Sequence, residues 1–322
     1  MMSKYILLVL ASVAVFAAQG QTSVYMHRQK KVDRMVLPGN YSGIAALGNG
    51  RYAVVSDKSE REGFFLFRID VDSVTGAVLD VENETFVSIG SPNRDIEGVA
   101  VRGTHIYIGG ESDNVVKVCL PDGTPTDLSS PCLFPSTQRN AGLESLTYDG
   151  TTDTFWTMEE WQKDGRLTLV QLDSMLHPIR LLHYQADQPI AKARRGLHAV
   201  GVSELCVMPD GRLLSLEREV SVPRRGMGAW CLCKLYMLEV PGRPGSHAVS
   251  SSTDDGFVRK SLLTQWRTRL NLTHRSFANY EGMCVGPKLA DGRFVLLLIA
   301  DSQNRYRGVL HDWIRSIVID LN

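Results

Sequence analysis

A hairpin-like unit recurs five times along the chain, and this repetition constrains the fold more than any other feature. Each unit has a short apolar stretch, a turn rich in Gly, Asp or Asn, and a second apolar stretch. In the third unit, residues 140–160, Asp149-Gly150 separates two runs of β-branched and aromatic residues. This pattern is typical of two antiparallel strands joined by a tight turn. The chain is therefore expected to be a series of related hairpins.

Acidic residues mark one end of these hairpins. The first strand opens with Ser42 in one unit and with Glu in the other four, at Glu97, Glu144, Glu204 and Glu281. The second strand ends in an acid in all five units, at Asp57, Glu111, Glu159, Glu217 and Asp301. Strands are usually depleted in Asp and Glu. The two columns therefore indicate a requirement for carboxylates where a first strand begins beside the end of a second strand.

A third apolar run follows every unit, and a weaker fourth run follows four of them, at residues 84–90, 132–134, 179–185 and 258–266. Four-stranded units at this spacing predict an all-β fold, a β-propeller with five four-stranded blades. The long interval after the fourth unit leaves room for a sixth blade. The fifth unit lacks a fourth run, and we expect the N-terminal segment Lys31–Leu37 to supply a strand that closes the ring and removes the open sheet edge. Helical periodicity is scarce, and the best candidates are the short stretches 261–270 and 311–315.

The N-terminus has the pattern of a targeting segment. Lys4 precedes an apolar run that ends at Ala18-Gln19-Gly20, with small residues at the positions a signal peptidase requires. We expect a signal peptide at residues 1–20 and a single domain at residues 21–322. The apolar run is shorter than a spanning helix needs, although an uncleaved anchor is the alternative. The protein is then exported, periplasmic or secreted, with no membrane span after cleavage.

Charge is balanced, with 35 basic and 35 acidic residues. This balance gives no sign of a basic surface that would bind nucleic acid or an acidic membrane. We expect a monomer whose partner is a small molecule.

Six cysteines are present, and none has the spacing of a zinc site. Export permits disulfides, and Cys119–Cys132 is the most plausible bridge. The other four cysteines are better explained as buried core thiols.

The innermost strands of a propeller line a central channel, so the acidic columns should converge at one mouth of it. Dense carboxylate oxygens suit Ca²⁺, which takes six to eight oxygen ligands. We assign as candidate metal ligands Asp57, Glu97, Glu111, Glu144, Glu204, Glu281 and Asp301. The alternative is a structural role, in which the acids accept backbone N–H groups or pair with arginines.

Several polar residues adjoin the acids in sequence. Arginine forks match phosphate and carboxylate oxygens, and we assign as candidate substrate-binding residues Arg94, Arg218, Arg305, Asn140 and Asn304. Internal salt bridges are the alternative for the arginines. The candidate catalytic acids are Glu144, Glu159 and Glu217. The chain has no G-x-S-x-G motif, so hydrolysis by a metal-activated water fits better than a serine nucleophile. His198 is a weaker candidate base or ligand.

These motifs together resemble a known family. They are Ser42-Gly43-Ile44, Asp95-Ile96-Glu97-Gly98, residues 140–146, residues 201–205 with Leu216-Glu217-Arg218, and Glu281-Gly282 with residues 301–304. The set is similar to the phytase-like domain family, described as "esterase-like activity of phytase", over nearly all of the chain after residue 20. The resemblance implies an exported bacterial β-propeller. By analogy with calcium-dependent phytases, it also implies hydrolysis of phosphate esters with bound Ca²⁺.

The sequence therefore predicts an exported Ca²⁺-dependent hydrolase that acts on a phosphate ester or a related ester. A non-catalytic binding or structural propeller with a stabilising Ca²⁺ is the first alternative. A lactonase-like Ca²⁺ hydrolase is the second.

Overall fold

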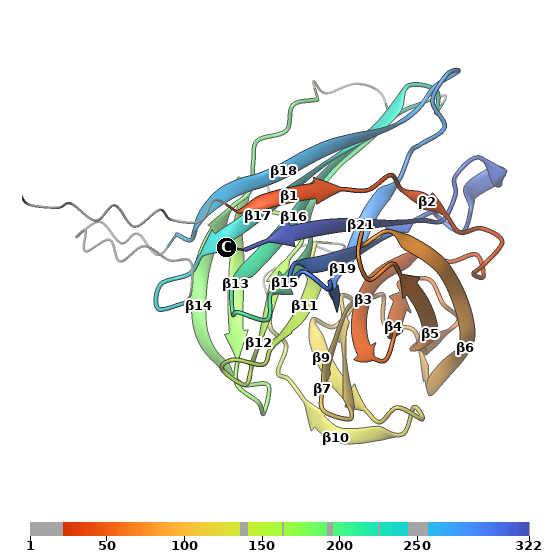
Figure 1. Ribbon diagram of the computed structural model, residues 1–322. Helices are drawn as coiled ribbons and strands as arrows, with labels where there is room; N and C mark the ends of the chain where they lie inside the picture. Colours follow the sequence, from red (N-terminus) through yellow and green to blue (C-terminus); the bar gives the residue numbers. More distant parts are fainter. Residues whose placement is uncertain are drawn as a thin grey trace, which may run out of the picture.

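Each sequence repeat folds as the inner hairpin of a four-stranded antiparallel sheet, and the five sheets surround a common axis (Figure 1). The computed structural model describes residues 22–135, 141–162, 164–191, 196–224, 226–243 and 257–321. Within these residues there are five blades, which confirms the predicted five-bladed β-propeller. No helix in this part of the chain is long and apolar enough to cross a membrane. The predicted signal peptide, residues 1–20, lies outside the described residues.

The strands of each blade run in sequence from the axis outward. The first blade has β3 (Tyr41–Gly48), β4 (Arg51–Ser56), β5 (Arg61–Val71) and β6 (Val78–Pro92). The second has β7 (Ile96–Arg102), β8 (His105–Gly110), β9 (Val115–Cys119) and β10 (Pro125–Ser129). The third has β11 (Leu143–Asp149), β12 (Thr154–Glu159), β13 (Arg166–Leu172) and β14 (Pro178–Gln185).

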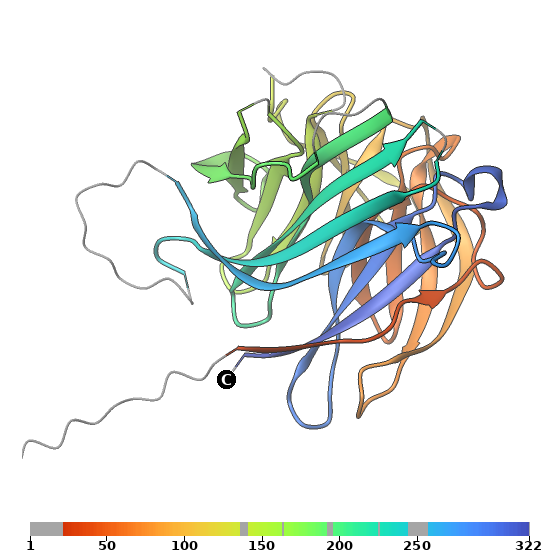
Figure 2. The same ribbon diagram turned by 90° about the horizontal axis from the view of Figure 1, so that it is seen from above.

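The fourth blade has the longest inner strands, and Figure 2 shows them in green and teal across the molecule. Its strands are β15 (Gly196–Val207), β16 (Leu213–Pro223), β17 (Ala229–Glu239) and β18 (Arg259–Leu270). The fifth blade has β19 (Asn279–Lys288), β20 (Phe294–Asp301) and β21 (Trp313–Asp320), with the short 3₁₀ turn η1 (Tyr306–Gly308) before β21.

The N-terminal segment closes the ring, as predicted, but through different residues. Strand β1 (Ser23–Met26) pairs antiparallel with β21, and β2 (Lys30–Lys31) continues along the same edge. Figure 1 shows β1, in red, beside β21, in dark blue. Most of the predicted segment Lys31–Leu37 is instead a turn, in which the Val36 N–H bonds to the Val32 carbonyl. Both valines are buried in the core between the fifth and first blades, so this segment anchors the closure.

Three further expectations were wrong. The stretch 261–270 belongs to strand β18, and residues 313–315 belong to β21, because cross-blade packing overrides a weak helical pattern in both. The outer strand of the second blade is β10 rather than residues 132–134. All six cysteines are free: Cys119 is buried, whereas Cys132 is exposed beyond β10, so the expected bridge is absent.

The hydrophobic core is divided among the five junctions between neighbouring blades. Each of the five buried apolar clusters draws its residues from two adjacent blades. In the cluster between the fifth and first blades, for example, Tyr41 and Phe67 pack with Leu297. Burial of apolar surface is the main stabilising force in such cores, so every blade depends on both neighbours.

Glycine lets the inner strands approach one another closely at the axis. A Cβ atom on Gly98 would lie 2.9 Å from the backbone nitrogen of Leu146 in the next blade. A Cβ atom on Gly282 would lie 3.0 Å from the backbone carbon of Gly43. These contacts are shorter than a side chain permits, so a larger residue here would push the blades apart.

Candidate functional site

A β-bulge interrupts every inner hairpin close to its acidic end. The bulge leaves one extra residue in the first strand, at Ser42, Glu97, Glu144, Ser203 and Glu281. Bulges change the direction of side chains and recur beside functional sites. In each blade, the residue before the bulge pairs with a residue of the second strand, and the residue after that partner lies level with the bulge. In the five blades this residue is Asp57, Glu111, Glu160, Arg218 and Asp301, in that order.

This register corrects the alignment of the repeats drawn from the sequence. In the fourth blade the bulge residue is Ser203, and Glu204 follows it. In the third and fourth blades Leu143 lies opposite Glu159 and Val202 lies opposite Glu217, so Glu160 and Arg218 take the position of the acids in the other blades. Side chains alternate between faces along a strand, so a shift of one residue exchanges the two faces.

Seven carboxylates from four blades converge at one mouth of the channel. We call this group the acidic funnel, and it consists of Asp57, Glu97, Glu111, Glu144, Glu160, Glu281 and Asp301. Burial, together with the neighbouring charges of Glu144 and Asp57, raises the pKa of Glu97 well above its usual range. Burial also raises the pKa of Glu111 to about 7 and that of Asp301 to about 6. Such values indicate carboxylates that lack full compensation by positive charge.

Two sets of three acids lie close enough to share a cation. The first triad is Asp57, Asp95 and Glu97, and the second triad is Glu111, Glu144 and Glu160. Within each triad one carboxylate oxygen per residue lies within 4.8 Å of the others. Hard oxygen donors in this arrangement fit Ca²⁺. In the first triad, Asp57 Oδ1 is buried and has no hydrogen-bond partner among the described residues, so it remains available as a ligand.

Lys58 contacts the first triad. Its ammonium lies 2.8 Å from Asp57 Oδ2 and 2.5 Å from Asp95 Oδ1, while its side chain is 59% exposed. Burial opposes its charge, but the hydrogen bonds to these two aspartates dominate and raise the pKa of Lys58. The first triad is therefore already paired with a cation that solvent can reach.

Arg218 contacts the second triad from the fourth blade. Its Nη2 atom lies 3.2 Å from Glu144, 3.0 Å from Glu160 and 3.1 Å from Glu281. Burial raises the pKa of Glu160, and the Arg218 charge opposes this effect. The sequence assigned Arg218 to the site, and the structure places it in the acidic funnel.

Glu159 and Glu217 lie on the other face of their strands, away from the acidic funnel. Glu159 accepts hydrogen bonds from the Thr168 backbone N–H at 2.7 Å and from the Gln162 amide at 2.8 Å. Glu217 accepts from the Tyr184 hydroxyl at 2.6 Å and pairs with Lys260. Glu159 thus has structural partners within the third blade, and Glu217 links the fourth blade to the third.

Glu204 lies at the level of Gly98 and Gly282 and is 1% exposed. Its Oε1 atom accepts the Leu205 backbone N–H at 3.0 Å, and burial raises its pKa well above the usual range. Backbone donors on Leu146 and Met283, from the two neighbouring blades, also stabilise the carboxylate. Glu204 therefore links three blades near the axis instead of joining either triad.

The remaining predicted residues are outside the acidic funnel. Arg94 pairs with Glu62 and Asp113, each at 2.5 Å. Arg305 pairs with Asp312 and donates to the Val36 carbonyl at 2.7 Å, which ties the loop after β20 to the N-terminal turn. Asn304 lies in that loop with a positive φ of 53°. Asn140 lies outside the described residues.

Sequence reasoning missed Asp95 and Lys58 and chose Glu159 over its neighbour Glu160. The Asp95-x-Glu97 spacing was a usable signal, because carboxylates two residues apart in a loop are a common arrangement of Ca²⁺ ligands. Nothing in the sequence separates Glu159 from Glu160, since the bulge in the partner strand decides which of them faces the axis.

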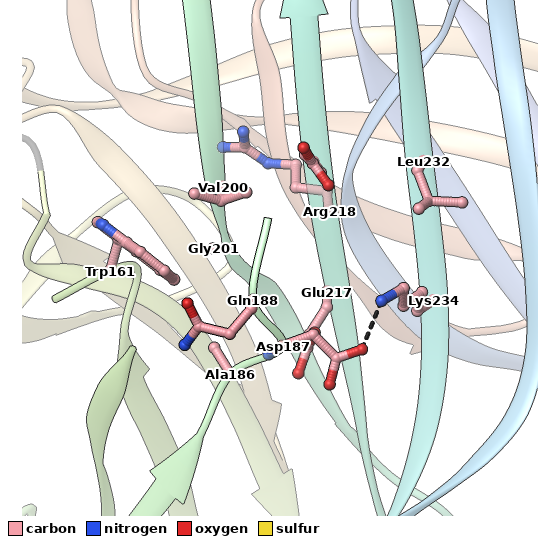
Figure 3. A pocket seen from close by; sticks show the side chains of 11 residues that line it. Trp161, Ala186, Asp187, Gln188, Val200, Gly201, Glu217, Arg218, Leu232 and Lys234 are labelled. Atoms are coloured by element: carbon pink, nitrogen blue, oxygen red, sulfur yellow. Dashed lines mark hydrogen bonds and ion pairs between the residues drawn. The ribbon is translucent and has the colours of Figure 1, made fainter. Parts of the chain in front are cut away.

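A small cavity adjoins Arg218 on the side of the third blade. It is lined by Trp161, Asp187, Gly201, Glu217 and Lys234, and its volume of about 20 Å³ has room for about one water molecule. Figure 3 shows the Arg218 guanidinium pointing away from the ion pair between Asp187 and Lys234. His198 lies in a different pocket, where its Nε2 atom is 3.0 Å from Glu219.

The acidic funnel is built from motifs that a known family model also matches. The family is described as "Phytase-like: Esterase-like activity of phytase", and its model matches residues 37–303. The chain belongs to this phytase-like family. The match includes the whole acidic funnel and all five inner hairpins. No curated protein matches the chain significantly.

Three solved structures show distant likeness. The PQQ-bound aldose sugar dehydrogenase from Streptomyces coelicolor has 11% identity and a TM-score of 0.46, with coverage of 93% of this chain and 99% of that chain. The glutaminyl cyclase of Myxococcus xanthus has 9% identity and a TM-score of 0.42, with coverage of 93% and 98%. Kuenenia stuttgartiensis hydrazine synthase has 12% identity and a TM-score of 0.38, and this chain covers 58% of its length while 84% of this chain is matched. Identities this low transfer no activity.

Proposed function

We propose that the protein is an exported, Ca²⁺-dependent hydrolase that acts on a phosphate ester or a related ester in the acidic funnel. The observation that carries this proposal is the pair of carboxylate triads at the mouth of the propeller channel. Membership of the phytase-like family supports it. Export is proposed from the pattern of residues 1–20 alone.

The first triad is the better candidate for the metal. Asp57, Asp95 and Glu97 provide three carboxylates, and solvent or substrate oxygens can complete the six to eight ligands of Ca²⁺. Bound Ca²⁺ supplies Lewis-acid polarisation and compensates the charge of an anionic substrate. Lys58 must leave its two aspartates for the metal to bind, and its exposed side chain permits this.

The second triad supplies acid–base groups to the reaction. Burial raises the pKa of Glu144 well above its usual range, and the Arg218 charge opposes this effect, which makes Glu144 the candidate general acid for a leaving oxygen. Glu160 takes the role that the sequence assigned to Glu159, because Glu160 lies in the acidic funnel. Arg218 Nη2 contacts Glu144 and Glu160 and holds these two carboxyl groups in place.

The test uses the purified chain from residue 21 onward, loaded with Ca²⁺ or treated with chelator, on a panel of phosphate esters, carboxylic esters and lactones. We expect product release that requires Ca²⁺ and that is lost, together with Ca²⁺ binding, in Glu97→Gln. The exposed Asp80→Asn is the control and should keep both properties. Absence of turnover on every substrate with Ca²⁺ bound would reject the hydrolase.

A non-catalytic propeller is the second candidate. The observation that favours it is the contact of Arg218 with three carboxylates, which compensates charge without any ligand. Under this alternative, Ca²⁺ raises the melting temperature but no ester is cleaved. Cleavage of lactones alone within the panel would indicate the lactonase-like hydrolase.

A further inference from the structure

The fivefold repeat provides an internal comparison for Arg218. At the same level of the second strand, the other blades carry an acid, at Asp57, Glu111, Glu160 and Asp301. Only the fourth blade has a positively charged residue at this level, Arg218, which lies opposite Gly201. The ring thus has a cationic side chain at a position where its own pattern calls for a carboxylate.

The contacts of Arg218 resemble the coordination of a cation. A single atom, Nη2, lies 3.0–3.2 Å from three carboxylate oxygens, and the side chain is only 8% exposed. The three acids come from the third and fifth blades, on the two sides of Arg218's own blade. Three carboxylates at this separation repel one another strongly unless a positive charge lies between them.

We infer that Arg218 is a tethered counter-cation that takes the place of a second divalent ion in the acidic funnel. It occupies the second triad through Glu144 and Glu160 and leaves the first triad as the exchangeable metal site. The inference deepens the proposed function, because it assigns one metal to one half of the acidic funnel. A guanidinium remains charged at every accessible pH, so Glu144, Glu160 and Glu281 keep a positive charge beside them whether or not Ca²⁺ is present.

The two triads differ in the way the inference requires. Lys58 on the first triad has an exposed, flexible side chain, so an ion can displace it. Arg218 on the second triad is buried and is bound to two other blades, so displacement would leave an unpaired charge inside the protein.

The test is the number of Ca²⁺ ions bound per chain, measured by equilibrium dialysis at pH 8 with wild type and Arg218→Gln. The glutamine removes the charge but keeps a polar side chain. We expect Arg218→Gln to bind one more Ca²⁺ than wild type. Arg218→Lys keeps the charge and should show no gain. Arg94→Gln is the matched control, because it removes another largely buried arginine from two acids outside the acidic funnel, and it should also show no gain.

Each outcome decides the question. Equal stoichiometry in folded Arg218→Gln and wild type would overturn the inference. A variant that folds only with Ca²⁺ would support it, and one that folds at no Ca²⁺ concentration would overturn it, because the ion then cannot replace the guanidinium. The proposed function is judged separately. If wild type binds no Ca²⁺ while Arg218→Gln binds one, the metal-dependent hydrolase fails and the counter-cation stands.

Discussion

Glu159 and Glu160 are consecutive in the sequence, yet their carboxylates lie on opposite faces of the third blade. Glu160 reaches the axis and lies 3.0 Å from Arg218, whereas Glu159 accepts the Thr168 backbone N–H on the outer side. The bulge at Glu144 in the partner strand sets this orientation. The pair therefore separates a role in the acidic funnel from a role in packing.

We predict that Glu160→Gln and Glu159→Gln have opposite effects. Glu160→Gln should lower turnover at least tenfold with a small change in melting temperature, because it removes a charge from the acidic funnel. Glu159→Gln should keep most of the activity but lose about 1–2 kcal/mol of unfolding free energy, because it weakens a buried hydrogen bond to the backbone. Kinetics and urea denaturation of both variants check this. Equal loss of activity in the two variants would contradict the assignment.

Lys58→Met should tighten Ca²⁺ binding. The Lys58 ammonium contacts Asp57 and Asp95 and competes with the metal, and methionine keeps the length of the side chain without the charge. We expect the dissociation constant measured by calorimetry to fall by roughly three- to tenfold, which corresponds to about 0.6–1.4 kcal/mol. Lys30→Met, which alters a lysine on the closing strand β2, is the control. An unchanged or weaker affinity in Lys58→Met would show that Ca²⁺ does not enter the first triad.

The metal-free protein should be less stable at pH 8 than at pH 5. Burial raises the pKa of Glu111 to about 7 and that of Asp301 to about 6, so the folded state binds these protons more tightly than the unfolded state. The resulting stability is complete below about pH 4 and is lost as pH rises through 6 to 7. We expect a decrease of roughly 2–3 kcal/mol, measured by urea denaturation with chelator present. Saturating Ca²⁺ should reduce the decrease, and a curve that rises with pH would contradict the prediction.

Gly98→Ala should destabilise the ring without touching the acidic funnel directly. The new methyl group would lie 2.8–2.9 Å from Leu146 Cβ and N in the neighbouring inner strand. Overpacking of this kind costs about 1–3 kcal/mol. Gly150→Ala is the control, because its methyl group would lie 3.7 Å from the Tyr148 ring. A melting temperature of Gly98→Ala equal to that of the control would mean that the inner strands can separate at no cost.

The repeats made much of the fold predictable. Alternating apolar residues and turn signals in five units determine the blades, because each hairpin must bury one face against a neighbour. The closing strand was predicted in kind but misplaced, since Val32 and Val36 look like strand residues in isolation and are instead buried on a turn. The helix candidates failed because each segment pairs with a neighbouring strand, β18 with β17 and β21 with β20.

The sequence by itself determined that carboxylates lie at one end of five hairpins. This arrangement led to the expectation of a cation site. Only the tertiary structure decided which carboxylates meet. A single-residue bulge in each inner strand chooses Glu160 over Glu159 and moves Glu204 out of the triads. The same register brings Arg218 into the acidic funnel, between Glu144 and Glu281, which are 137 residues apart in sequence. Alternation has a period of two, so an unpredicted bulge inverts every assignment that follows it.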